Sequence, residues 1–315
     1  MRAELRCWCG IAVLSFATGC SSAGVIDPGG DNGNNGTDSP LSSYFIKPAL
    51  CNDASGPDCT RLRLGDGYLT TTTPARGALY ACSPGNANAP GSTRSRITWI
   101  DDEAKTWDLL RKPWLPSGQF APAAGTFSMS EQGTTRMILV NNLPVDGRIG
   151  NWPMTSYAAL TSIDQNPGVP AARSYTFNLS LYPLPAERYG CVPAGSIGVS
   201  LNGVVFYNAA DARGNDAVAH EIVDAYGGHP ATSDYHYHFV PEHLDTKRLA
   251  DGHSDIVGYI RDGYPIYGYR GAGGTEMSNA DLDECHGHEH GTLGYHYHAT
   301  IEYPYTVGCY KGTPK

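Results

Sequence analysis

The histidines of this chain are concentrated in one segment, and their spacing suggests chemistry. All 11 lie within residues 220–298 of a 315-residue sequence. A Tyr-His-Tyr-His motif occurs at 235–238 and again at 295–298, and a further histidine precedes each motif, His229 and His288. Neutral imidazole is a good ligand for zinc, copper, iron and nickel. The pattern therefore predicts binding of a transition metal.

The alternation within each motif predicts which side chains would face the metal. Successive side chains of an extended strand point to opposite faces, so the two histidines share one face and the two tyrosines the other. Tyrosines on such a face pack and use their hydroxyls as hydrogen-bonding groups. We therefore expect the main ligands to be His236, His238, His296 and His298.

Four more repeated residues complete the candidate site. We expect them to be further ligands or partners that hold the imidazole tautomers: His229, His288, Asp224 and Asp283. Copper or zinc is the expected ion, with copper slightly ahead because the donors are nitrogen and oxygen and an exported protein meets an oxidising compartment. The alternative is a purely structural lattice of Tyr and His hydrogen bonds. The unrepeated His286 and His290 could supplement the second set, whereas ordinary polar roles are expected for His220, His243 and His253.

These motifs belong to an internal repeat with an offset of about 60 residues. The segment Asn202–Tyr207 aligns with Asp262–Tyr267, and the motif at 235–238 aligns with the motif at 295–298. Ordered blocks at a nearly constant offset indicate duplication of one small unit. We expect two copies of a β-rich module, at about 197–256 and 257–315.

The same blocks resemble a known family. The Tyr-His-Tyr-His motifs occur together with Gly228-His229-Pro230, Asp262–Gly268 and Leu282–Cys285, as in the YHYH protein family. The resemblance covers roughly residues 190–312. It implies a YHYH domain at 191–315 in a protein of a mostly exported group, and it implies no particular reaction.

A second metal-related pattern occurs only once. Residues 220–224 read His-Glu-Ile-Val-Asp, which resembles the H-E-x-x-H helix of zinc proteases with Asp in the last place. A short helix from Asp216 to a stop at Gly227-Gly228 is expected here. The second copy has Ala280 opposite His220, so the pattern is not part of the repeated unit, and a protease is not favoured.

The N-terminus is typical of an exported lipoprotein. Residues 1–19 combine two arginines, a short apolar run and small residues, which predicts a signal peptide. Cys20 follows Gly19 as in a bacterial lipobox, so we expect lipidation of Cys20; the alternative is an ordinary secretory signal cut nearby. Residues 20–43 then form a flexible linker rich in Gly, Asn and Asp. The expected location is the cell envelope, anchored to the bacterial outer membrane.

The cysteine count fits an oxidising compartment. Beyond Cys20 there are six cysteines: Cys51, Cys59, Cys82, Cys191, Cys285 and Cys309. An even number predicts up to three disulfides, for which 15 pairings exist. A local Cys51–Cys59 bridge is expected from their proximity, and the other pairings stay open.

Composition limits the remaining possibilities. Residues 44–190 contain short alternating runs separated by Pro and Gly and contain no histidine, which indicates a β-rich scaffold. The expected fold class is therefore mainly β with few short helices. The net charge of -9 argues against nucleic acid as a partner, since phosphate binding needs a basic face. Contact with a membrane is expected through the lipid anchor only.

Three functions fit these residues. The first is capture, delivery or sensing of a metal ion. The second is a metal-dependent hydrolase or oxidoreductase in which Asp224, Asp283 or Glu221 would act as a general base. The third is a metal-free adhesion or carbohydrate-binding module, which would expose many of the 13 tyrosines from Tyr207 onward.

Overall fold

The computed structural model describes residues 41–52, 56–118 and 123–315. The expected signal peptide, Cys20 and the linker up to residue 40 lie outside the described residues. The described chain has 18 strands and two short α-helices, so the prediction of a mainly β fold is confirmed. None of its helices has the length and apolar character needed to span a membrane.

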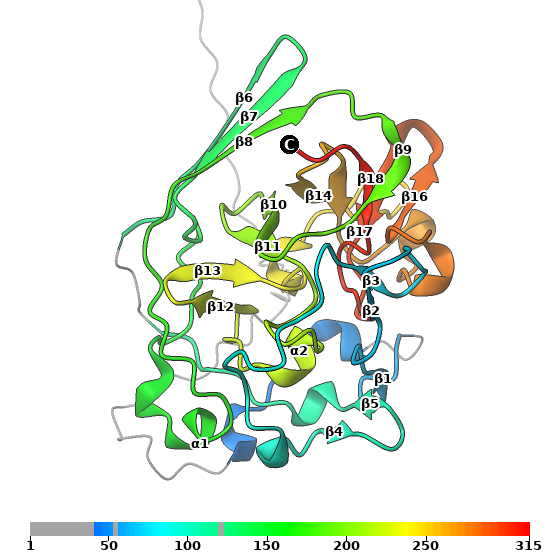
Figure 1. Cartoon of the computed structure of the whole chain (residues 1–315). Helices are drawn as coiled ribbons and strands as arrows, with labels where there is room; N and C mark the ends of the chain where they lie inside the picture. Colours follow the sequence, from blue (N-terminus) through cyan, green and yellow to red (C-terminus); the bar gives the residue numbers. More distant parts are fainter. Residues whose placement is uncertain (1–40, 53–55, 119–122) are drawn as a thin grey trace, which may run out of the picture. The chain divides into compact units, whose positions relative to one another are not determined.

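The largest sheet has eight strands and carries both Tyr-His-Tyr-His motifs (Figure 1). In spatial order its strands are β12 (Gly228–Ala231), β13 (Asp234–Tyr237), β11 (Val205–Tyr207), β10 (Ser196–Ser200), β14 (Ile256–Ile260), β15 (Pro265–Tyr267), β17 (Gly294–His298) and β16 (Gly287–His290).

The two halves of this sheet have the same pairing pattern. In each half, a first antiparallel pair (β10–β11 or β14–β15) joins a second (β12–β13 or β16–β17) through a parallel contact. Strands β10 and β14 meet antiparallel at the centre. The motif strands β13 and β17 are therefore five strand spacings apart, about 24 Å along the sheet. Residues of the two motifs cannot share one ion.

The other strands form smaller sheets around the eight-stranded one. β6, β7 and β8 form an antiparallel sheet (Figure 1), and buried side chains of β7 and β8 pack against those of β10, β11 and β14. The remaining strands form one three-stranded and two two-stranded sheets. Their bounds are β1 (Leu62–Arg63), β2 (Leu69–Thr70), β3 (Leu79–Tyr80), β4 (Ile100–Asp101), β5 (Thr106–Trp107), β6 (Phe127–Gln132), β7 (Thr135–Val140), β8 (Tyr175–Ser180), β9 (Pro185–Gly190) and β18 (Tyr310–Gly312).

The helices are short. The α-helices are α1 (Ala158–Thr161) and α2 (Ala217–His220), and the 3-10 turns are Leu41–Tyr44, Ala49–Asn52, Arg94–Arg96, Leu109–Arg111, Met154–Ser156, Glu242–Leu244, Ala272–Gly274, Asn279–Asp281 and Gly291–Leu293. Helix α2 begins as expected, with Asp216 accepting from the Ala219 N–H at 3.2 Å. It ends at His220 and not at Gly227, because the backbone becomes extended at Glu221.

Residues 44–190, which we name the histidine-free region, share one hydrophobic core with the region that carries the Tyr-His-Tyr-His motifs. Trp99, Trp107 and Leu115 belong to the same buried cluster as Phe206 and Tyr235. A backbone bridge between Leu115 and Asp224 links the two regions directly. Residues 44–190 therefore pack against the sheet that carries the histidines.

Three disulfides connect the described residues. The expected Cys51–Cys59 bridge is present, and the other pairs are Cys82–Cys191 and Cys285–Cys309. The Cys82–Cys191 bridge joins the histidine-free region to the segment that leads into β10. It closes the longest covalent loop, with a sequence separation of 109.

Candidate metal centres

His229, His236 and His238, which we name the first cluster, converge at one end of the large sheet. His229 on β12 lies directly opposite His236 on β13, and His238 follows two residues later on the same face. The His238 Nε2 lies 3.0 Å from His229 Nε2 and 3.1 Å from His236 Nε2. All three side chains are buried. Ring nitrogens from two strands thus meet at one point.

Backbone carbonyls fix the tautomers of two of these rings. The Nδ1–H of His236 donates to Asp234 O at 2.8 Å, and the Nδ1–H of His238 donates to Asn208 O at 2.5 Å. A carbonyl can only accept, so each Nδ1 carries the hydrogen and each Nε2 presents a lone pair. Two lone pairs that face each other at 3.1 Å repel unless a cation lies between them.

Protonation of one imidazole does not supply that cation, because the pKa values of these rings are low. Burial lowers the pKa of His238 to about 4, and it lowers the pKa values of His229 and His236 well below their usual range. Neighbouring imidazoles lower the pKa values of His229 and His236 further, because two positive rings would repel. The three rings are neutral at physiological pH, the form that binds a metal ion.

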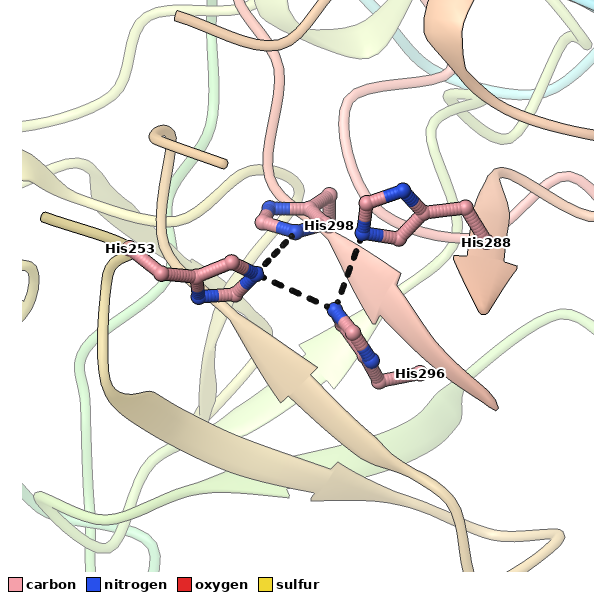
Figure 2. Close-up of side chains that lie close together, drawn as sticks. All are labelled: His253, His288, His296 and His298. Atoms are coloured by element: carbon pink, nitrogen blue, oxygen red, sulfur yellow. Dashed lines mark hydrogen bonds between the residues drawn. The ribbon is translucent and has the colours of Figure 1, made fainter. Parts of the chain in front are cut away.

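His253, His288, His296 and His298 form a second cluster at the opposite end of the sheet (Figure 2). His288 on β16 lies opposite His296 on β17, His298 ends β17, and His253 comes from the loop before β14. The shortest Nε2–Nε2 distances are 3.0 Å for His288–His296, 3.1 Å for His253–His298 and 3.2 Å for His253–His296.

The second cluster is oriented in the same way as the first. Its Nε2 lone pairs converge because Nδ1 hydrogens are held elsewhere. Burial lowers the pKa of His296 to about 3, and also lowers the pKa values of His288 and His298. Three rings donate to backbone carbonyls: His253 to Ser254 at 2.6 Å, His296 to Gly294 at 2.8 Å and His298 to Gly268 at 2.7 Å.

These distances suit a small metal ion. Zinc–nitrogen bonds of about 2.0–2.1 Å in a tetrahedron place ligand atoms about 3.3 Å apart. The contacting nitrogen pairs of both clusters lie 3.0–3.2 Å apart. Within each cluster all ligand atoms lie within 4.8 Å of one another. The residues of each cluster therefore could hold one ion, and imidazole alone does not choose between zinc and copper.

The segment that carries the first cluster is similar to a known protein family. Residues 176–280 match the family described as YHYH protein. The chain carries a YHYH domain. The match includes the first cluster and His253, and the other three histidines of the second cluster lie beyond it. Neither the curated proteins nor the solved structures that were compared match the chain.

The tyrosines of the YHYH domain occupy the opposite face of the motif strands, as the alternation predicts. Tyr235 and Tyr237 are buried and pack edge to face at 5.8 Å. Tyr237 accepts a hydrogen bond from Asn202 Nδ2 at 3.0 Å, and beyond the matched segment Tyr297 donates to Asp262 at 2.6 Å. Asn202 and Asp262, 60 residues apart, therefore each form a hydrogen bond with the hydroxyl of the second tyrosine of a motif.

Asp224 and Asp283 were expected to be further metal ligands or partners that orient the imidazoles, but they lie apart from the convergent histidine nitrogens. Neither belongs to the two groups of convergent ligand atoms. Asp224 accepts from Tyr235 OH at 2.7 Å and from the Gly228 N–H at 3.2 Å; Asp283 accepts from Tyr295 OH at 3.1 Å and from the Gly287 N–H at 3.1 Å. Both carboxylates thus lie by the tyrosine hydroxyls and accept hydrogen bonds from the turn before the His-bearing hairpin. Backbone carbonyls orient the imidazoles instead.

His253 is the residue that sequence reasoning missed. It was expected to be an ordinary polar residue because it is not repeated between the two copies. Its loop, closed by an Arg248–Ser254 bridge, brings it to the second cluster from outside the motif strands. No spacing signal predicts such a contact, since the distance between loop and strand depends on tertiary packing.

Glu221, considered above only as a general base, lies beside the first cluster. Its Oε2 is 3.4 Å from His229 Nε2 and 3.7 Å from His238 Nε2. Burial raises its pKa well above the usual range, and Asp164 and Asp211 raise it further. Lys112 Nζ donates to Glu221 O at 2.8 Å, and the adjoining Ile222 N–H donates to Asp164 at 2.9 Å. The histidine-free region thus positions this carboxyl.

The remaining histidines have other partners. His220 contacts the Asp66 carboxylate at 2.9 Å, and His286 contacts Thr300 Oγ1 at 3.0 Å. His290 stacks on His253 with ring centroids 5.5 Å apart and contacts Asp251 at 3.2 Å, so it lies next to the second cluster. It is not among the convergent ligand atoms.

Proposed function

We propose that the protein binds two transition-metal ions, one in each cluster, and serves in capture, delivery or sensing of copper or zinc. The observation that carries this proposal is the set of facing Nε2 lone pairs. At His236–His238 and at His253–His298, both rings have their Nδ1 hydrogen committed to a carbonyl. Folding forces these lone pairs together, and an ion between them converts the repulsion into bonds.

The tyrosine content does not favour a metal-free adhesion module. All of the tyrosines from Tyr207 to Tyr310 are buried or half-buried. Carbohydrate or surface binding through tyrosine would need exposed rings. The two clusters of convergent histidine nitrogens favour metal binding instead.

Metal content of the untagged exported chain, residues 21–315, tests the proposal. Mass spectrometry after incubation with copper or zinc should find two ions per chain. His236→Ala should remove one ion, and His296→Ala with His298→Ala, which leaves two imidazoles in the second cluster, should remove the other. The two effects should be independent, since the two motif strands lie about 24 Å apart. His243→Ala is the matched control and should retain both, because His243 belongs to neither cluster.

Two results would contradict the proposal. One is a folded chain that stays empty of copper and zinc. The other is a full complement of two ions in a folded double variant, His236→Ala with His296→Ala. Near-ultraviolet circular dichroism of each variant establishes that the protein is folded, so that loss of metal is not confused with loss of structure.

We also propose that the chain is exported and anchored to the cell envelope through Cys20, with the metal ion as its partner and no nucleic acid. The signal-like residues 1–19 and Gly19-Cys20 support this, and three disulfides fit an oxidising compartment. Incorporation of labelled fatty acid should be lost in Cys20→Ser. A protein that is released in soluble form with Cys20 intact would contradict the anchor.

A further inference from the structure

We propose that the two centres differ in kind: the first keeps one coordination position open to a pocket and binds a small outside ligand there, whereas the second has a complete protein ligand set. This inference rests on the proposed metal binding. It names a ligand site that the histidine pattern alone does not contain.

The number of convergent nitrogens is the first step. The second cluster offers four imidazoles, which fill a tetrahedral shell, and the first offers three. Metal sites with four protein ligands are typically structural, and sites with three keep a position for water or substrate. Glu221 contacts His229 and His238 from one side and is not within the convergent group.

A pocket reaches the first cluster directly. Its volume is about 870 Å³, and its lining includes all three histidines of the first cluster and Glu221. None of the four histidines of the second cluster lines it. Pockets of about 300–1,000 Å³ hold small organic ligands. An ion in the first cluster would therefore be reached from this pocket by a molecule of that size.

The walls of the pocket come from both regions of the chain. Ser83 and Pro84 line one part, and Ala194 and Arg213 line another. The Cys82–Cys191 disulfide stands next to both walls in sequence and ties them together. The pocket is therefore a product of the packing between the histidine-free region and the YHYH domain.

The charge of the lining indicates the class of ligand. Three carboxyl groups line the pocket, those of Asp164, Asp211 and Glu221, against one cation, Arg213. The Arg213 Nε–H and Nη1–H already donate to the carbonyls of Ala89 and Ser92. Burial raises the pKa values of all three carboxyls, and those that stay ionised oppose the attraction of the bound ion's own charge for anions. The site is suited to a small neutral molecule with one nitrogen or oxygen donor atom.

Cobalt(II) and imidazole test this inference in the exported chain, residues 21–315. Metal content is measured first, so that a failure to bind metal, which refutes the proposed function, is distinguished from a failure to bind imidazole. Imidazole is then titrated while the visible absorption of the bound cobalt is followed. The spectrum should change with intact protein and with His298→Ala, and should stay constant with His238→Ala, which retains only the second centre.

A variant that touches no histidine gives an independent test. Ala212 lines the pocket and is exposed, so Ala212→Trp should fill part of it while both ions stay bound. We expect imidazole affinity to fall about tenfold or more, which corresponds to about 1.4 kcal/mol. Ala104→Trp, on an exposed turn that does not line the pocket, is the matched control and should leave the affinity unchanged.

The charge argument has its own readout. Asp211→Asn keeps the side-chain oxygen that accepts the Arg213 and Asn215 N–H groups at 2.8 Å. It should raise the affinity for azide about threefold, because one negative charge is removed, and leave imidazole affinity unchanged. An imidazole response that persists in His238→Ala, or equal affinities in Ala212→Trp and Ala104→Trp, would overturn the inference.

Discussion

At the scale of single residues, the tautomer of an imidazole and the direction of its Nε2 lone pair depend on the hydrogen bond that its Nδ1 makes. His238 gives its Nδ1 hydrogen to Asn208 O, and His298 gives its Nδ1 hydrogen to Gly268 O, the position 60 residues later. Because these acceptors belong to the backbone, no side-chain substitution removes them. The imidazoles are thereby held in the tautomer that a metal needs before any metal is bound.

This arrangement predicts how the stability of the metal-free protein depends on pH. The pKa of His238 falls from 6.5 to about 4 on folding, so the unfolded chain binds more protons between these values. Stability supported by the neutral ring is complete above about pH 6.5 and is lost as the pH falls toward 4. For a side chain this deeply buried the loss is about 3 kcal/mol.

Urea unfolding of metal-free protein at pH 7.0 and pH 4.5 measures the effect. His238→Asn, which removes the titrating ring, should lose less stability than the parent over this interval, by an amount approaching 3 kcal/mol. Carboxyls with raised pKa values such as Asp216 contribute with the opposite sign in both proteins, so their contribution cancels in the comparison. An identical pH dependence in the two proteins would show that His238 is already protonated or exposed when folded.

At the scale of elements, the hairpins β12–β13 and β16–β17 are the units that present the rings. Each hairpin has a histidine pair across its strands and a tyrosine pair on the reverse face. Each is preceded by an aspartate that accepts hydrogen bonds from the turn and from a tyrosine hydroxyl. The imidazoles and the packing tyrosines are thus separated onto the two faces of one strand.

These hydrogen bonds predict that substitution of Asp224 lowers the stability of the protein, whereas substitution of the histidines lowers its metal content. Asp224→Ala removes the acceptor of Gly150 N–H at 2.7 Å, Trp152 Nε1–H at 3.1 Å and Tyr235 OH at 2.7 Å, all of them buried. Unfolding free energy should fall by at least about 3 kcal/mol. Folded protein should still bind two ions per chain.

The matching substitution at the second hairpin serves as control. Asp283→Ala should cost less, because its side chain is 24% exposed and its bond to Tyr295 OH is longer, at 3.1 Å. Urea unfolding and metal analysis of both variants provide the comparison. Selective loss of one ion from folded Asp224→Ala protein would show that this carboxylate acts on the metal.

At the scale of the whole molecule, the histidine-free region completes the first centre. It supplies one wall of the pocket and holds the Glu221–Ile222 peptide through Lys112 and Asp164. Burial lowers the pKa of Lys112 to about 7. The region is therefore more than a spacer, because it forms part of the surroundings of the first cluster.

Loop length predicts which disulfide stabilises the molecule most. In the chain-entropy description, closing a loop of 109 residues contributes about 4.8 kcal/mol and closing a loop of 8 residues about 2.5 kcal/mol. Unfolding free energies of Cys82→Ala/Cys191→Ala and Cys51→Ala/Cys59→Ala, measured in urea, should differ in that order. An equal or reversed order would mean that packing between the regions already restrains the unfolded chain.

The sequence by itself determined the mainly β class, the similarity of one segment to the YHYH family, the local Cys51–Cys59 bridge and the face of each motif residue, because these follow from alternation, ordered motifs and short separations. It placed His229 with His236 and His238, since a repeated spacing reflects a repeated hairpin. Metal identity, export and the duplication stay predictions. Only the tertiary structure decided that His253 joins the second cluster, that Glu221 lies beside the first, and that Asp224 and Asp283 face the tyrosines. Those contacts link segments whose distance depends on how loops and the histidine-free region pack, which no local pattern encodes.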